Sequence, residues 1–125
     1  MRKEAVIEIN GLWAGYDGEI ILEDINLTLY QSDFLGIIGP NGGGKTTLLK
    51  CILGLLKPFR GSIRLMGKSV QEGRCHVGYV PQHIDFDRQF PIRVWEVVQM
   101  GLLGCRKLLQ PITQADRELI EGALQ

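Results

Sequence analysis

Residues 39–46 combine closely spaced glycines with a lysine and a threonine, in the order Gly-Pro-Asn-Gly-Gly-Gly-Lys-Thr. This stretch matches the pattern G-x-x-x-x-G-K-[ST] in full. Glycines lack a β-carbon, so their backbone N–H groups can approach phosphate oxygens closely, and the start of a following helix favours an anion. Lys45 supplies a charge for the β- and γ-phosphates, and the Thr46 hydroxyl supplies a ligand for Mg²⁺. The pattern therefore predicts a loop that binds the phosphates of a nucleotide.

The alternative interpretation of this stretch is a glycine-rich turn before an ordinary helix. The flanking sequence favours phosphate binding, because a continuous apolar run precedes the loop and apolar residues at helical spacing follow it. The dinucleotide pattern G-x-G-x-x-G does not fit, since Thr47 stands where its last glycine is needed. The candidate phosphate-binding residues are Gly39, Pro40, Asn41, Gly42, Gly43, Gly44, Lys45, Thr46 and Thr47.

The charges of the chain are unevenly distributed around this loop. The net charge is zero, from 14 basic and 14 acidic side chains, but residues 34–71 contain basic side chains and no acidic one. Carboxylates repel a triphosphate, so an acid-free segment suits such a ligand. On charge alone, a solvated basic face is the alternative interpretation. The neutral total gives no support to nucleic-acid binding, and none is expected.

Cysteine and histidine usage argues against a disulfide framework or a resident metal. The three cysteines are widely separated and form no C-x-x-C pair, which is typical of a protein in a reducing cytosol. Residues 83–87 could be imagined as a metal site, but no other part of the chain supplies matching ligands. No apolar run approaches the roughly 18 residues that a membrane span needs.

Hydrophobic periodicity predicts alternating strands and helices along the chain. Residues 34–38 are a continuous apolar run, typical of a strand that is buried on both faces, and residues 77–80 predict a further apolar strand. Thr113 and Asp116 have the spacing of a capping box and predict the start of a final helix. Strands are expected over residues 5–10, 25–30, 34–38, 62–66 and 77–80, and helices over 45–56, 92–101 and from 113 onward.

Beyond the loop motif, the chain resembles the ATP-binding subunits of ABC transporters. The resemblance rests on residues 39–49, on Leu-Glu-Asp-Ile-Asn-Leu at 22–27 and on Val-Gly-Tyr-Val-Pro-Gln at 77–82. It implies an α/β P-loop NTPase fold with an N-terminal antiparallel β portion, incomplete at the C-terminus. Residues 1–125 would be the N-terminal part of one nucleotide-binding domain. Within it, residues 1–82 would hold the strands and phosphate-loop core, and residues 83–125 the start of a helical subdomain.

The same resemblance assigns two further site residues. Tyr16 stands where the family places an aromatic ring that stacks on adenine, and its alternative is a simple turn aromatic. Gln82 would contact Mg²⁺, position the attacking water and link the site to a membrane partner, and its alternative is a polar loop residue. Lys45 and Gln82 are the expected catalytic residues, with ATP and Mg²⁺ as cofactors.

Residues 85–101 most resemble the metal-ion importers of this family, of the manganese, zinc or iron type. The implied partners are a membrane-embedded permease and a second ATP-binding subunit, which forms a dimer with the first. The implied location is the cytoplasmic face of the cell membrane, where the subunit would be peripheral.

Several motifs of the family do not occur within these 125 residues. The sequence contains no L-S-G-G-Q-type signature, no apolar strand ending in Asp-Glu and no later switch histidine. We therefore expect this chain alone to bind ATP without hydrolysing it. The alternative is a complete but non-catalytic nucleotide-binding or interaction module. A Ras-type GTPase fits less well, because N-K-x-D is absent.

Overall fold

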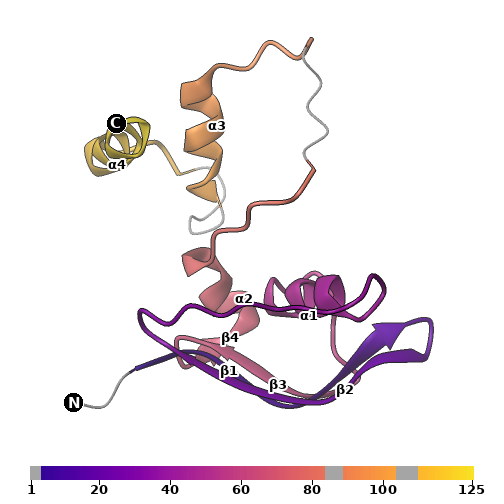
Figure 1. The fold of residues 1–125 in the computed structure, drawn as a ribbon. Coiled ribbons are helices and arrows are strands. Elements are labelled where there is room, and N and C mark those ends of the chain that lie inside the picture. Colours follow the sequence, from indigo (N-terminus) through magenta and orange to yellow (C-terminus); the bar gives the residue numbers. More distant parts are fainter. Residues whose placement is uncertain (1–3, 84–88, 104–109) are drawn as a thin grey trace. The chain divides into compact units, whose positions relative to one another are not determined.

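The computed structural model describes residues 4–83, 89–103 and 110–125. Contacts within the chain divide it into two units, Met1–Val77 and Gly78–Gln125, whose elements are labelled in Figure 1. The first unit contains β1 (Ala5–Tyr16), β2 (Glu19–Tyr30), α1 (Lys45–Ile52), β3 (Arg60–Leu65), β4 (Lys68–Ser69), α2 (Val70–Gly73) and the 3₁₀ helix η1 (Arg74–His76). The second unit contains α3 (Val94–Met100) and α4 (Gln114–Leu124).

The strands of the first unit form one antiparallel sheet in the order β2-β1-β3-β4. β1 and β2 are joined by a two-residue turn in which both Asp17 and Gly18 have positive φ, 50° and 82°. Positive φ at both turn positions matches the twist of the flanking strands and favours a hairpin. The N-terminal antiparallel β portion is therefore present, and its two long strands extend well beyond the predicted segments 5–10 and 25–30.

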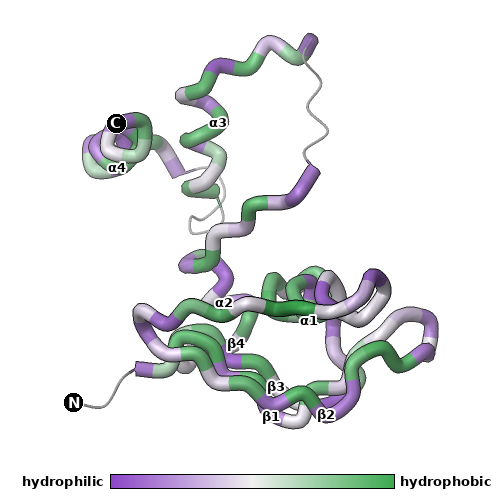
Figure 2. Tube along the Cα trace, viewed as in Figure 1, coloured by the Kyte–Doolittle hydropathy of each residue, from purple (hydrophilic) through white to green (hydrophobic). Residues whose placement is uncertain are grey.

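α1 covers one face of this sheet and closes the core (Figure 1). Side chains in β3 alternate between the two faces, with Ile63 and Leu65 buried and Ser62 and Arg64 exposed, as the pleat of a strand requires. Hydrophobic residues, green in Figure 2, lie along both α1 and the strands that it covers. The buried cluster consists of Ile9, Leu12, Ala14, Leu22, Leu48, Cys51, Ile52, Ile63 and Leu65.

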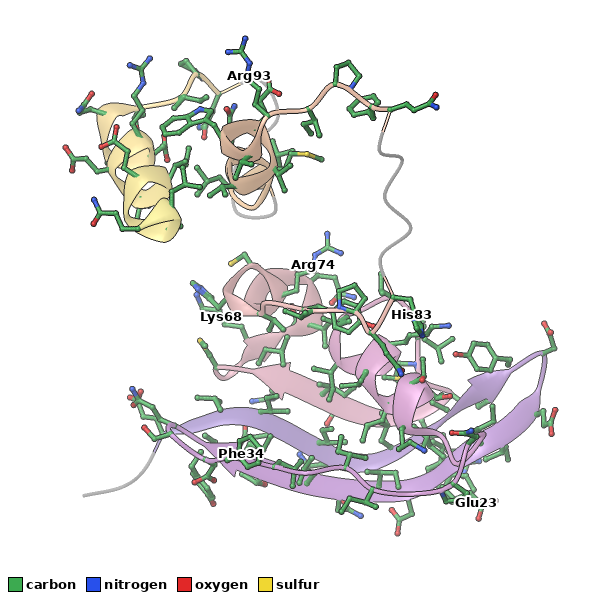
Figure 3. All side chains as sticks on the ribbon, turned by 45° about the horizontal axis from the view of Figure 1, so that its top comes forward. Glu23, Phe34, Lys68, Arg74, His83 and Arg93 are labelled. Carbon is green, nitrogen blue, oxygen red and sulfur yellow. The ribbon has the colours of Figure 1, made fainter. Side chains whose placement is uncertain are left out.

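Two of the predicted strands are absent from the described structure. Residues 34–38 adopt no strand, and Phe34 and Ile38 are 99% and 97% exposed; Phe34 is labelled in Figure 3. Residues 77–80 adopt no strand either, and Val80 is exposed. A strand is stabilised by hydrogen bonds to a neighbouring strand, and none of the described residues pairs with these two segments.

α1 is shorter than the predicted helix over residues 45–56. Leu53 is its C-cap, and Gly54 follows with φ of 72°, a left-handed conformation that ends helices. The N–H groups of Leu55 and Leu56 then turn back to the carbonyl oxygen of Lys50, at 2.8 and 3.2 Å. The remaining leucines of the apolar pattern therefore lie in the connection to β3.

In the second unit, α3 and α4 contact each other. The capping box predicted at Thr113 is confirmed. The Thr113 N–H donates to Asp116 Oδ2 at 2.6 Å, and the Asp116 N–H donates to Thr113 Oγ1 at 3.3 Å. α3 lies within the predicted helix 92–101, while most of the imagined metal site at 83–87 falls on residues 84–88, outside the described part of the chain.

Candidate functional site

The glycine-rich loop ends at the first residue of α1, as the motif predicts. Gly44 is the N-cap of the helix, with φ of 85° and ψ of 2°, and Gly42 has φ of 82°. These left-handed conformations are costly for residues that carry a β-carbon, so glycine at both positions suits the path of the loop. The N–H groups at the start of α1 that have no partner within the helix therefore lie next to the exposed loop.

Gly44 also packs tightly against the hairpin. A β-carbon at this position would lie 2.6 Å from Leu22 Cδ2 and 3.2 Å from Ile21 Cγ2, so any other residue would require the Leu22 side chain to move. Within the loop, the Gly43 N–H donates to the carbonyl oxygen of Pro40 at 3.1 Å. The base of the loop is thus fixed by β2 and by an internal turn.

The backbone of the loop holds the Lys45 side chain in place. Its ammonium nitrogen donates to the carbonyl oxygens of Gly39 and Pro40, both at 2.6 Å. An ammonium group has three donors, so one remains after these two bonds. The lysine is therefore presented at the loop with capacity for a further acceptor, such as a phosphate oxygen.

The two threonines of the motif lie in different environments. The Thr46 side chain is exposed beside the loop, where its hydroxyl is accessible to a cation. The Thr47 side chain is 4% exposed and belongs to the buried face of α1. No acidic residue occurs in the first turn of α1, so the partial positive charge of the helix start is not neutralised there.

Tyr16 lies at the end of β1, and its ring contacts α1. The ammonium nitrogen of Lys50 lies 5.3 Å from the centroid of the Tyr16 ring, and the tyrosine is 37% exposed. The first unit therefore brings the predicted base-stacking residue beside the helix that begins at the phosphate loop. The sequence identifies Lys50 only as one of the basic residues in the acid-free segment. It does not predict the contact with Tyr16, because 33 residues lie between the two.

Gln82 belongs to the second unit and is exposed. Its predicted contact with Mg²⁺ and the attacking water stays a prediction. In the described ranges, no group of three or more His, Cys, Asp or Glu residues could hold a metal ion. No helix in the part of the chain that the structure describes is long and apolar enough to cross a membrane.

The chain is similar to known proteins over nearly its whole length. The family model described as ABC transporter matches residues 22–122. A probable metal transport system ATP-binding protein of Chlamydia trachomatis is 44% identical over 125 residues, covering 99% of this chain and 52% of that protein. The manganese transport system ATP-binding protein of Bacillus subtilis is 40% identical over 118 residues, covering 94% and 47%. The chain thus spans about half the length of these curated relatives.

A solved structure shares the fold. The structure of cbiO1 from Clostridium perfringens, part of the ABC transporter complex cbiONQ, matches with a TM-score of 0.75 at 26% identity. The match covers 98% of this chain and 50% of that one. The predicted α/β P-loop fold with an N-terminal antiparallel portion is confirmed by this likeness.

Proposed function

Since this chain belongs to the ABC transporter family, we propose that it is the ATP-binding part of a subunit that energises the import of a metal ion. The observation that carries the proposal is the geometry of the phosphate loop. Two left-handed glycines, a tethered lysine and the open start of α1 converge on one exposed site. Backbone N–H groups and a lysine at a helix start form a ready-made site for phosphate.

Different residues of the site bind different parts of Mg·ATP. The N–H groups of residues 39–47 bind phosphate oxygens, and Lys45 neutralises the β- and γ-phosphates. Thr46 offers its exposed hydroxyl to Mg²⁺. Tyr16 would stack on the base. Gln82 would be a further contact for Mg²⁺ and would position the attacking water, as the family resemblance implies. The bound Mg²⁺ would stabilise the charge that develops on the phosphates.

This chain alone binds ATP without turning it over. Hydrolysis needs groups that orient water and stabilise charge in the transition state. The 125 residues contain no signature sequence and no Asp-Glu strand that could supply them, which supports this part of the proposal. In transport, the chain acts with a second ATP-binding subunit and a membrane-embedded permease, on the cytoplasmic face of the membrane.

The names of the relatives support a metal ion as the cargo. One relative is a manganese transport system protein and another a probable metal transport system protein. The test is accumulation of radioactive manganese, and separately of zinc, in cells that lack the gene of the whole subunit of which we propose this chain is the ATP-binding part. The gene should restore accumulation of one of these ions, and the Lys45→Ala version should not. Equal restoration by both versions, or unaltered uptake in the deletion strain, would contradict the proposal.

A further inference from the structure

Lys50 and Tyr16 make a contact that no motif of the phosphate loop explains. Lys50 lies in the last turn of α1, and Tyr16 lies at the end of β1, next to the hairpin turn. The lysine nitrogen is 5.3 Å from the ring centroid, within the range of a cation–π interaction. The contact ties the tip of the hairpin to the helix that begins at the phosphate loop.

We propose that Lys50 is a positioning residue for the nucleobase: its ammonium covers one face of the Tyr16 ring and holds the ring for a base to stack on the other face. This inference rests on the proposed function, because it takes the loop as an ATP site. The lysine itself touches neither phosphate nor base in this account.

The surroundings of Tyr16 explain why such a restraint matters. The tyrosine precedes the turn residues Asp17 and Gly18, and it is 37% exposed. A side chain at a hairpin tip loses rotational freedom when a ligand orders it, and that loss weakens binding. A ring already held by Lys50 loses less freedom. Its exposed surface remains available for stacking.

The position of Lys50 along α1 separates it from the phosphate-binding lysine. Lys50 follows Lys45 by five residues, which is about 7.5 Å along a helix axis. A competing explanation is that Lys50 only complements the negative end of the helix dipole. That role would affect the stability of α1 but would not depend on the Tyr16 ring. The two explanations therefore differ in whether the effect of Lys50 requires Tyr16.

The experiment measures binding of two ligands, Mg·ATP and Mg·tripolyphosphate, by calorimetry. Lys50→Met removes the charge and keeps an unbranched side chain that is one atom shorter, whereas Lys50→Arg keeps a cation that can lie over a ring. We expect Lys50→Met to weaken ATP binding by about two- to fivefold, the size of an exposed cation–π contact. Tripolyphosphate has no base, so its affinity should not change. Lys50→Arg should restore ATP affinity.

A double-mutant cycle with Tyr16→Ala completes the test. In the Tyr16→Ala background, Lys50→Met should have no further effect on ATP affinity. An undiminished loss in that background, an equal loss of tripolyphosphate affinity, or no loss at all would each overturn the role of Lys50. The tripolyphosphate arm also reports that the loop is folded. An unaltered protein that binds neither ligand would overturn the proposed ATP site itself, and the inference about Lys50 would fall with it.

Discussion

The ammonium nitrogen of Lys45 lies 2.6 Å from the carbonyl oxygen of Pro40, which precedes the lysine by five residues in the same loop. A second bond of the same length joins the lysine to Gly39. These bonds fix a long, flexible side chain before any ligand arrives, so less of its rotamer freedom is lost on binding. The loop is therefore organised around the position that a phosphate would take.

The two left-handed glycines of the loop should respond differently to substitution. Gly44→Ala combines an unfavourable φ with a β-carbon 2.6 Å from Leu22 Cδ2. Gly42→Ala has a similarly unfavourable φ, but its β-carbon would have no other atom within 4 Å. We expect Gly42→Ala to lower the free energy of unfolding by about 1–2 kcal/mol. Gly44→Ala should cost clearly more, measured by urea unfolding. Equal costs would show that the contact with β2 is unimportant.

The exposed apolar run before the loop should contribute little to the stability of this chain. Phe34 is 99% exposed, while Leu12 in the core is fully buried. Phe34→Ala should therefore change the free energy of unfolding by no more than about 0.5 kcal/mol. Leu12→Ala should lower it by about 2–5 kcal/mol. A loss for Phe34→Ala as large as that for Leu12→Ala would mean that residues 34–38 are packed in solution.

Cys51 should be an unreactive thiol. Burial raises the pKa of the Cys51 thiol, so a smaller fraction is thiolate at any given pH, and only the thiolate attacks. In variants that retain a single cysteine, maleimide labelling at pH 7.5 should be much slower at Cys51 than at the half-buried Cys75. Urea should abolish the difference. Comparable rates in the folded protein would contradict the burial of Cys51.

The capping box of α4 gives a local prediction in the second unit. Thr113→Ala removes the side chain that accepts from the Asp116 N–H, and loss of an N-cap costs about 1 kcal/mol. Amide hydrogen exchange in the first turns of α4 should accelerate correspondingly. Thr113→Ser keeps the hydroxyl and is the matched control. Protection that is the same in Thr113→Ala and Thr113→Ser would argue against the cap.

The parts of the fold that the sequence predicts correctly are those determined by local chemistry. The phosphate loop, the helix start at Lys45 and the Thr113–Asp116 box depend on residues a few positions apart. Residues 34–38 have the composition of a buried strand, but a strand also needs a partner, which the described residues do not supply. Composition alone does not report whether a partner is present.

The contact between Tyr16 and Lys50 has a different origin. It depends on the packing of α1 against β1 and on the irregular register of the β1–β2 pair, which contains several bulges or shifts. A bulge changes which side chains face the helix, and neither residue type signals where it falls. Contacts between elements therefore depend on packing that the residue types alone do not determine.

The central claim is that the loop at the start of α1 binds the phosphates of ATP, and calorimetric titration with Mg·ATP tests it most directly. The matched pair is Lys45→Ala and Lys57→Ala, since each removes one lysine and only Lys45 is tethered to the loop. Lys45→Ala should weaken binding by about 10- to 100-fold, the size of hydrogen bonds to a charged group. Lys57→Ala should leave the affinity unchanged. Unaltered affinity in Lys45→Ala, or equal losses in both variants, would contradict the account.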